Sequence, residues 1–310
     1  MLLVRNPQSF PFDRVAGGSV VTIGAFDGLH LGHQALLHAA FDTAGKTGMP
    51  TVVMSFEPTP KEFFAGDKPP ARLMRFREKF DALAQCGVDI FFCPRFDSTM
   101  RDIDAATFVR RLLVHTMNVR ELIIGDDFRF ARRREGNVET LERAGVALNF
   151  SVAQAPSVIV GGERVSSTAI RDALWSGDLQ RAERLLGKPY RMSGRVIPGQ
   201  KLGRDLGYPT ANVNLQRRQS AVMGIFAVRV SGISDVPLDG VASVGTRPTF
   251  DGVKPLLEVH IFDFDEDVYG RYIHVDFIAR LREERKFDSA DALIEQMHID
   301  SRQAREILAA

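Results

Sequence analysis

Two histidines stand where an apolar segment gives way to a predicted helix. The stretch VVTIGAFDGLHLGH, residues 20–33, places His30 and His33 three positions apart in a glycine-rich setting. Glycines let a backbone approach a ligand closely, and the free N–H groups at a helix start attract anions. Both imidazoles would lie on one side of the helix, where they could donate hydrogen bonds to phosphate oxygens that gain charge in a transition state.

This stretch differs from the common nucleotide loops. It has neither the G-x-x-x-x-G-K-[ST] pattern of a P-loop nor the G-x-G-x-x-G pattern of a dinucleotide site. Two histidines with this spacing can also bind a metal or be purely structural. The absence of H-E-x-x-H and of a nearby third ligand argues against a metal, and the glycines at a strand end favour a phosphate site over a structural pair.

A second cluster of phosphate-binding type is SSTAIR, residues 166–171. A helix start there would present the hydroxyls of Ser167 and Thr168, and Arg171 would add a planar, permanently charged group for phosphate oxygens. By itself the pattern is a common helix N-cap. It gains weight because it follows the histidine motif at the opposite end of the same predicted domain.

The third cluster is GQKLGRDLGYPTANVNL, residues 199–215. Its glycines, Gly203 and Gly207 among them, could close over phosphates through backbone N–H groups. Thr210 and Asn212 would share one face of a strand, and their oxygens suit a Mg²⁺ ion that keeps several waters and binds substrate phosphates. The same residues could equally form a turn before a polar strand.

Glu258 lies in a further predicted strand, PLLEVHIF. Strand alternation puts Leu257, Val259 and Ile261 on one face, and Glu258 with His260 on the other. A carboxylate in this position could accept the proton of a substrate hydroxyl during phosphoryl transfer. The alternative is an exposed strand glutamate without such a role.

The first half of the chain alternates strands and helices, which predicts a parallel, doubly wound, Rossmann-like α/β sheet. Ligands of such sheets bind at the carboxyl ends of the strands. The loops after the first and fourth predicted strands should therefore lie at the functional edge. Strands are expected at residues 20–24, 51–56, 88–93, 121–125 and 146–153, and helices at 33–44, 75–87 and 104–117, with Asp104 as an N-cap.

The pattern changes near Gly187. Two short helices are expected around Gly177, followed by short β-type runs without intervening helices and a final helix capped by Ser289. Such runs predict an antiparallel barrel or sandwich, of which we favour a six-stranded barrel. The predicted domains are residues 1–187 and 188–310. The runs are residues 190–197, 210–215, 225–230, 241–245, 256–264 and 272–279.

Composition limits the classes of protein that are possible. The 310 residues suffice for about two domains. Lys and Arg number 40 against 39 Asp and Glu, so there is no basic excess of the kind a nucleic-acid binder needs. The two cysteines, Cys86 and Cys93, are separated by six residues and match no zinc or disulfide pattern. Without a signal peptide or an apolar run of about 20 residues, a cytoplasmic location away from membranes is expected.

The motifs together resemble a known family. GAFDGLHLGH and SSTAIR resemble the two signatures of the nucleotidyltransferase superfamily. FEPTPKEFF and GDDFRFARRREG, residues 56–64 and 125–136, resemble flavin-side segments of bacterial bifunctional riboflavin kinase/FAD synthetases. PTAN, EVHI, VGTRPTF and the segment 279–297 resemble the kinase half of that family. The sequence departs from the family pattern at Thr59, where histidine is usual, and at Ala131 and Arg133, where glycines are usual.

The resemblance implies two reactions: phosphorylation of riboflavin to FMN in the barrel, and adenylylation of FMN to FAD, with release of pyrophosphate, in the first domain. Riboflavin, FMN and ATP would be the substrates, with Mg²⁺ as cofactor. One alternative is a riboflavin kinase with a weak or re-purposed adenylyltransferase, and another is a flavin-binding protein without catalysis. A homo-oligomer is compatible with the sequence.

The resemblance also implies roles for individual residues. Those at the reacting groups would be His30, His33, Arg171 and Glu258, and the metal ligands Thr210 and Asn212. The residues that would bind ATP are Gly24, Phe26, Asp27, Gly28, Ser167, Thr168, Gly203 and Gly207. The residues that would bind flavin are Phe56, Pro58, Asp126, Phe128 and Arg247.

Overall fold

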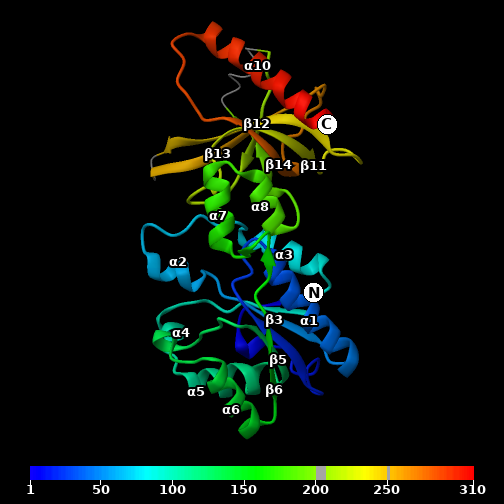
Figure 1. Cartoon of the computed structure of the whole chain (residues 1–310), viewed down its shortest axis with the longest axis vertical. Coiled ribbons are helices and arrows are strands. Elements are labelled where there is room, and N and C mark those ends of the chain that lie inside the picture. The colour runs from blue at the N-terminus through cyan, green and yellow to red at the C-terminus, as the bar shows by residue number, and fades with distance from the viewer. Residues whose placement is uncertain (200–206, 250–251) are drawn as a thin grey trace. The chain divides into compact units, whose positions relative to one another are not determined.

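The computed structural model describes residues 1–199, 207–249 and 252–310, except for the side chains of 247–249 and 252–254. The chain divides into two compact units (Figure 1). The first comprises Met1–Pro70 and Phe76–Val165, and the second comprises Ala71–Arg75 and Ser166–Ala310. Gly203 lies outside the described residues, as does the side chain of Arg247.

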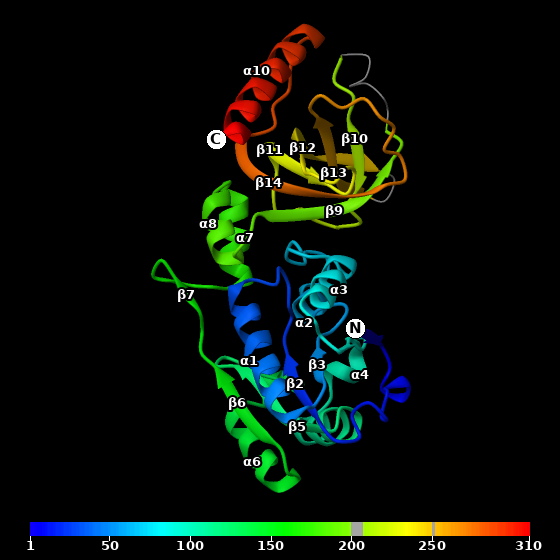
Figure 2. The same cartoon turned by 90° about the vertical axis from the view of Figure 1, so that its right-hand side faces the viewer.

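A parallel sheet forms the centre of the first unit, with strand order β1-β4-β3-β2-β5-β6. Figure 2 shows β2 between β3 and β5. The sequence predicted β2 to β5 but not β1, which is a short strand at the sheet edge. The strands are β1 (Leu2–Val4), β2 (Ser19–Ile23), β3 (Thr51–Met54), β4 (Ile90–Phe92), β5 (Val119–Gly125) and β6 (Ser151–Ala155). A separate hairpin pairs β7 (Ile159–Val160) with β8 (Glu163–Arg164).

Helices cover both faces of this sheet. Val20 and Ile123 pack against residues of α1 on one face, whereas Val21 and Leu122 belong to the core on the other face, together with Leu112 of η2. The strands are therefore apolar on both sides, as a parallel sheet requires. The helical segments are η1 (Pro7–Ser9), α1 (Leu31–Thr47), α2 (Pro60–Ala65), α3 (Phe76–Gln85), α4 (Ser98–Arg101), α5 (Ala105–Thr107), the π-helical η2 (Phe108–Thr116), η3 (Arg132–Arg134) and α6 (Val138–Leu148).

The last predicted strand of this unit is wrong in its first part. Residues 146–148 end α6, and β6 begins only at Ser151. Asn149 takes the left-handed conformation with φ 62° and closes the helix, because its N–H bonds the carbonyl of Gly145. An apolar run of this length fits a helix end as well as a strand. The predicted helix N-cap Asp104 is confirmed, since its carboxylate accepts from the N–H of Thr107 at 2.8 Å.

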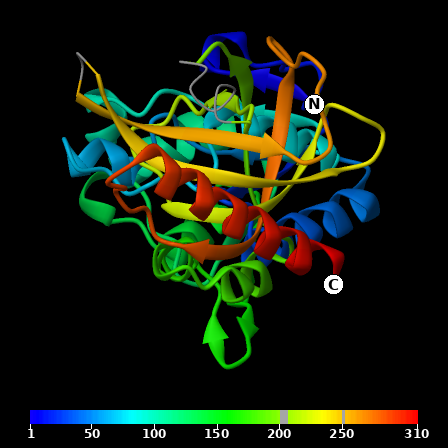
Figure 3. The same ribbon diagram turned by 90° about the horizontal axis from the view of Figure 1, so that it is seen from above.

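The second unit is built on a closed antiparallel barrel with strand order β10-β13-β12-β11-β14-β9, which confirms the six predicted strands. Helix α8 packs on β9 and β14, α7 packs against α8, and α10 lies across β11, β12 and β14 (Figure 3). The strands are β9 (Tyr190–Ile197), β10 (Ala211–Asn214), β11 (Gly224–Ser231), β12 (Leu238–Thr249), β13 (Gly252–Ile261) and β14 (Tyr272–Arg282). The helices are α7 (Ser167–Ser176), α8 (Leu179–Leu186) and α10 (Ala290–Ala309).

Three local predictions concern these helices. Gly177 ends α7 with φ 82°, and the Ser289 hydroxyl caps α10 by accepting from the N–H of Ala292 at 3.2 Å. Both were expected. The predicted domain division at residue 187 stays a prediction. In the structure α8 packs on β9 and β14, and α7 packs on α8. Helices α7 and α8 therefore belong to the second compact unit.

Candidate active sites

The histidine motif forms the junction between β2 and α1. His30 is the N-cap of α1, and its Nδ1 accepts from the N–H of His33 at 3.3 Å. The two imidazole rings stack, with centroids 3.7 Å apart and planes inclined by 19°. The prediction that both rings lie on one side of the helix start is therefore confirmed.

The loop that leads to this helix has an unusual backbone. Phe26 and Leu29 take positive φ angles of 49° and 43° without being glycine, and Gly28 has a φ of 89°. A left-handed non-glycine residue costs of order 1–3 kcal/mol and persists only where its surroundings hold it. Phe26 is fully buried, and its ring lies 5.1 Å from that of His33. Side-chain packing thus holds this backbone in its left-handed conformation.

Gly24 and Asp27 complete the loop. A Cβ atom on Gly24 would lie 3.1 Å from the ring of Phe26, so glycine allows that ring to fold back against the strand end. Asp27 is only 6% exposed. Both residues therefore shape the loop that was predicted to bind ATP, whereas their contact with the nucleotide stays a prediction.

Lys79 of α3 also belongs to this site, and the sequence reasoning missed it. Its ammonium group donates to the carbonyl of Ala25 at 2.7 Å and lies 3.5 Å from the hydroxyl of Ser55. The side chain is buried, at 3% exposure. A lysine in a helix is usually expected to face solvent. Its burial could have been predicted from its spacing of three and four residues from Phe76 and Leu83, which puts it on the buried face of α3.

These neighbours control the charge of His33. Burial, then the nearby His30 and Lys79, hold the pKa of His33 well below its usual range. His33 is therefore neutral at neutral pH. A neutral imidazole still carries one N–H that can donate to a phosphate oxygen.

The second nucleotide motif lies at the start of α7. The hydroxyl of Ser166 caps the helix by accepting from the N–H of Ala169 at 3.1 Å, so Ser167 and Thr168 occupy the first turn as predicted. Nε of Arg171 donates to the carbonyl of Ala71 at 2.6 Å. Because α7 belongs to the second unit, the predicted joint action of Arg171 with the histidines stays a prediction.

A cluster of aromatic rings lies after the carboxyl end of β3, the strand that pairs with β2. Phe56 meets Phe96 edge to face at 5.4 Å, and Phe96 also contacts Phe63 and Phe64 at 5.2 and 5.9 Å. Phe64 is 65% exposed. Parallel strands end at one edge, so these rings follow the strand beside the one that carries the histidine loop.

Pro58 and Thr59 form the entry to α2. The peptide bond before Pro58 is cis. Thr59 is the N-cap in a capping box with Glu62, in which each side chain bonds the other's backbone N–H. The departure from the family's histidine at this position thus supplies a helix cap.

Asp126 and Phe128 follow β5 on the other side of β2. Asp126 accepts from the hydroxyl of Ser157 at 3.0 Å and from its N–H at 3.1 Å. These bonds with Ser157, together with Arg164, lower the pKa of the Asp126 carboxyl. The ring of Phe128 stacks on that of Phe130 at 5.8 Å. Both predicted residues therefore lie at the expected edge of the sheet.

The two missing family glycines lie in the same loop. Ala131 has φ 64° and ψ −176°, a region that is essentially restricted to glycine, and Arg133 has φ 52° and ψ 22°. The backbone keeps glycine-like conformations although neither residue is glycine. The loop therefore carries conformational strain next to the predicted flavin-side residues.

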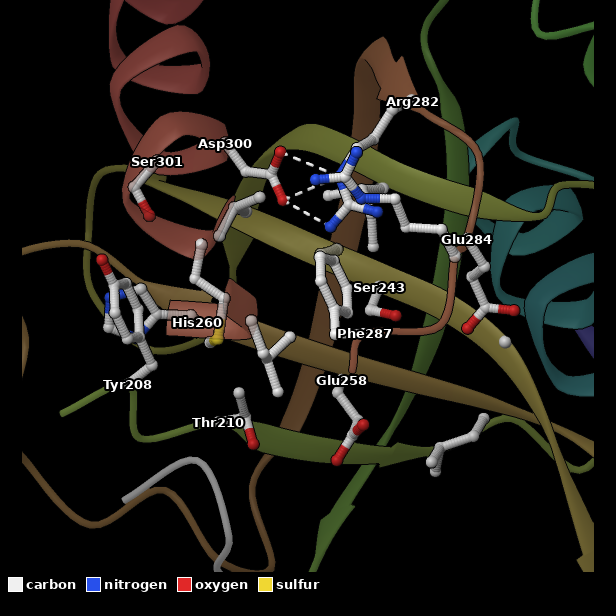
Figure 4. Close-up of a pocket in the computed structure, with 18 of the residues that line it drawn as sticks. Tyr208, Thr210, Ser243, Glu258, His260, Arg282, Glu284, Phe287, Asp300 and Ser301 are labelled. Atoms are coloured by element: carbon white, nitrogen blue, oxygen red, sulfur yellow. Dashed lines mark hydrogen bonds and ion pairs between the residues drawn. The ribbon is translucent and has the colours of Figure 1, made fainter. Parts of the chain in front are cut away.

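The predicted kinase residues meet in a pocket of about 560 Å³ within the second unit (Figure 4). Glu258 of β13 pairs with Asn212 of β10 on one side and with Ser243 of β12 on the other. Directly paired residues project to the same face of a sheet, and all three line the pocket together with Thr210. The predicted alternation is confirmed, because Leu257 and Val259 are fully buried.

Asn212 fits closely against the backbone. It is only 7% exposed, and a Cβ atom on Gly199 would collide with its amide group. Gly207, with φ 82°, lies three residues before Thr210. No group of three or more His, Cys, Asp or Glu side chains that could hold a metal occurs within the parts of the chain described above.

The opposite wall of the pocket comes from the end of β14 and from α10. Arg282 donates to the Asp300 carboxylate from Nε at 2.9 Å and from Nη2 at 2.7 Å, and Asp300 is 3% exposed. The carboxylate of Glu284 lies where a Cβ atom on Gly245 would be. Burial raises the pKa of Glu284. The sequence reasoning did not assign these residues, although they lie in the segment that resembles the family's last strand and helix.

The chain is a transferase built from a parallel α/β unit and an antiparallel barrel. The FAD synthetase family model matches residues 13–169, and the riboflavin kinase family model matches residues 186–308. The chain belongs to the family of bifunctional riboflavin kinase/FMN adenylyltransferases.

Individual relatives agree with this assignment. The Escherichia coli K12 bifunctional riboflavin kinase/FMN adenylyltransferase is 48% identical over 289 residues, which cover 93% of this chain and 92% of that protein. The Pseudomonas fluorescens enzyme of the same name is 45% identical over 293 residues, which cover 94% of each chain. A crystal structure described as a macrolide-efflux protein from Streptococcus pneumoniae superposes with a TM-score of 0.81 at 31% identity and covers 98% of both chains.

No helix in the described parts of this chain is both long and apolar enough to cross a membrane.

Proposed function

We propose that the barrel pocket phosphorylates riboflavin to FMN, and that the loop between β2 and α1 directs adenylylation of FMN to FAD. The observation that carries the first half is the row of Asn212, Glu258 and Ser243 across three paired strands of one pocket. The observation that supports the second half is the stacked histidine pair at the start of α1. Family membership supports both reactions together.

In the kinase reaction Glu258 would accept the proton of the ribityl 5′-hydroxyl as that oxygen attacks the terminal phosphorus of ATP. Thr210 and Asn212 would hold the nucleotide phosphates and Mg²⁺. Their oxygens are hard donors, and the lack of a carboxylate cage in the described residues fits an ion bound mainly by phosphates and waters. The ion would neutralise phosphate charge, while positioning supplies the rest of the acceleration.

In the adenylyl transfer the FMN phosphate is itself the nucleophile. Its oxygen would attack the α-phosphorus of ATP, and pyrophosphate would leave with the former bridging electron pair, so no covalent enzyme intermediate is needed. His30, His33 and Arg171 would donate hydrogen bonds to oxygens that gain negative charge in this step. Phe56, Pro58, Asp126 and Phe128 would bind the flavin of FMN.

The test is an HPLC time course with riboflavin, ATP and Mg²⁺, in which FMN should rise and then be converted to FAD. Glu258→Ala should lower FMN formation by about 10²–10⁴-fold and leave added FMN convertible to FAD. His33→Ala should lower only FAD formation, by about 10²–10³-fold. His38→Ala, an exposed histidine of the same helix, is the matched control. Equal loss of both activities in either variant would contradict the assignment of separate sites.

A riboflavin kinase with a weakened or re-purposed adenylyltransferase is the second candidate, and the strained Ala131 and Arg133 favour it. FMN accumulating without FAD would support this reading. A panel of FMN, phosphopantetheine and glycerol phosphate as acceptors would then identify the accepted class. The cytoplasmic location and a homo-oligomer stay predictions.

A further inference from the structure

Two histidines hold the segment that leads into β10. Nδ1 of His260 lies 2.9 Å from the carbonyl oxygen of Pro209, and Nδ1 of His298 lies 2.5 Å from the hydroxyl of Tyr208. The ring of Tyr208 stands edge-on to both imidazoles, with centroids 5.0 and 5.4 Å away. The residues just before Thr210 are thus bonded to β13 on one side and to α10 on the other.

The bond to Pro209 fixes the orientation of Thr210. A carbonyl oxygen only accepts, so Nδ1 of His260 must carry the hydrogen. The Pro209 carbonyl and the Thr210 nitrogen belong to one planar peptide unit, and the proline ring restricts its own φ to about −65°. The bond from His260 to that carbonyl therefore fixes the orientation of the peptide plane that joins Pro209 to Thr210. This orientation limits where the Thr210 side chain can point.

The strand that carries this anchor also carries the predicted base. His260 follows Glu258 by two residues on β13, and both line the pocket with Thr210 (Figure 4). Glu258 and Thr210 are therefore fixed to the same strand, the first covalently and the second through His260.

The second anchor is itself held firmly. His298 and Asp300 lie on α10, and the buried carboxylate of Asp300 forms an ion pair with the partly buried Arg282 of β14. Tyr208 is 8% exposed, so its hydroxyl needs a partner inside the protein, and His298 provides one. Helix α10, which forms one wall of the pocket, thus also holds Tyr208, two residues before Thr210.

We propose that His260 and His298 are positioning residues for phosphoryl transfer, because they clamp Tyr208 and Pro209 so that Thr210 is preset for the ATP phosphates. The inference rests on the proposed role of Thr210. Neither histidine needs to touch a substrate. Their loss should therefore act on the use of ATP, and leave riboflavin binding and adenylyl transfer unchanged.

The first test compares His260→Asn with His260→Leu. The Asn side chain can place an N–H near the position of Nδ1, whereas Leu fills similar space without a donor. His260→Leu should lower kcat/KM for ATP in riboflavin phosphorylation by about 10- to 100-fold, with the KM for riboflavin unchanged. His260→Asn should restore most of the loss. Equal losses in both variants, or full activity in His260→Leu, would overturn the proposal.

The second test serves if His260→Leu does not fold. Tyr208→Phe and His298→Phe each remove the hydroxyl–imidazole bond and keep a ring in place. Each should lower kcat/KM for ATP, and the double variant should lose no more than either single one, because the same bond is removed. Fully additive losses would contradict the clamp. Urea unfolding followed by Trp and Tyr emission, which comes from the second unit, is the folding control for the barrel.

Thr210→Val separates failure of the inference from failure of the proposed function. If Thr210→Val phosphorylates riboflavin normally, the role of Thr210 is wrong and the clamp has no purpose in catalysis. If Thr210→Val is inactive while His260→Leu and His298→Phe are fully active, the proposed function stands and the positioning role is excluded.

Discussion

His33 shows how one partly buried residue links stability to pH. In the unfolded chain a histidine takes up a proton near pH 6.5, whereas burial beside His30 and Lys79 resists that proton in the folded protein. As the pH falls below that value, the unfolded state binds more protons than the folded state. The free energy of unfolding must therefore decrease with falling pH in this range.

The first prediction is that His33→Gln makes the first unit less sensitive to acid. Hydrogen exchange of β2 and β5 amides at pH 7.5 and 5.5 should show a smaller loss of opening free energy in His33→Gln than in the unsubstituted protein. His38→Gln, at an exposed position of the same helix, should keep the original loss. Identical pH dependence in all three proteins would contradict the assignment of this effect to His33.

The second prediction concerns Ala131, whose backbone is in a conformation that glycine adopts without strain. Ala131→Gly should stabilise the first unit by about 1 kcal/mol, because relief of about 1–3 kcal/mol exceeds the entropic cost of glycine, about 0.5–1 kcal/mol. Arg133→Gly should gain less, since the left-handed region costs only about 1–2 kcal/mol.

Hydrogen exchange of the amides that pair β5 with β6 would measure this gain. Arg132→Gly is the matched control, because Arg132 is not among the residues with positive φ. A stability of Ala131→Gly equal to or below that of Arg132→Gly would show that the strain is relaxed in solution. An accompanying rise in FAD formation would connect the strain to adenylyl transfer.

At the scale of elements, alternation along single strands was enough to predict half of the barrel pocket. The position of Glu258 opposite Leu257 and Val259 follows from a period of two, and so does the shared face of Thr210 and Asn212. The other half depends on which strands pair. Nothing in the run 279–287 indicates that Arg282 meets Asp300, because that contact requires β14 to close the barrel and α10 to fold back on it.

The third prediction tests how α10 is held. Asp300→Asn removes the carboxylate that pairs with Arg282, whose side chain is 18% exposed, and should destabilise the second unit by about 1–3 kcal/mol. Asp263→Asn removes a similar ion pair between α10 and the barrel, with Arg305, but those side chains are 77% and 50% exposed. It should cost at most about 1 kcal/mol.

Fluorescence can measure this difference within one unit. Trp175 and the tyrosines at 190, 208, 269 and 272 account for the one Trp and four Tyr of the chain, and all lie in the second unit. Urea unfolding followed by their emission therefore reports on the barrel and its helices. Equal midpoints for Asp300→Asn and Asp263→Asn would mean that burial of the ion pair does not matter for holding α10.

At the scale of the whole molecule, the chain order and the packing order differ. Residues 71–75 precede α3 of the first unit in sequence, but they pack within the second unit. Arg75 donates to the side chains of Gln216 and Tyr272 at 3.0 and 2.8 Å. Arg217, at 6% exposure, donates to the carbonyls of Arg72 and Leu73 at 2.5 and 3.2 Å. No periodicity or motif predicts contacts between segments so far apart in sequence.

The last prediction is that these bonds stabilise the second unit. Arg217→Met keeps the apolar stem but leaves the buried carbonyl of Leu73 and the partly buried carbonyl of Arg72 without this donor, which should cost about 1.5–3 kcal/mol. Arg218→Met, at the exposed neighbouring position, removes the same charge and should change stability by less than about 0.5 kcal/mol. Urea unfolding followed by Trp and Tyr emission measures both. If the two midpoints coincide, the bonds between Arg217 and residues 71–75 do not stabilise the barrel. Residues 71–75 would then serve only to connect α2 with α3.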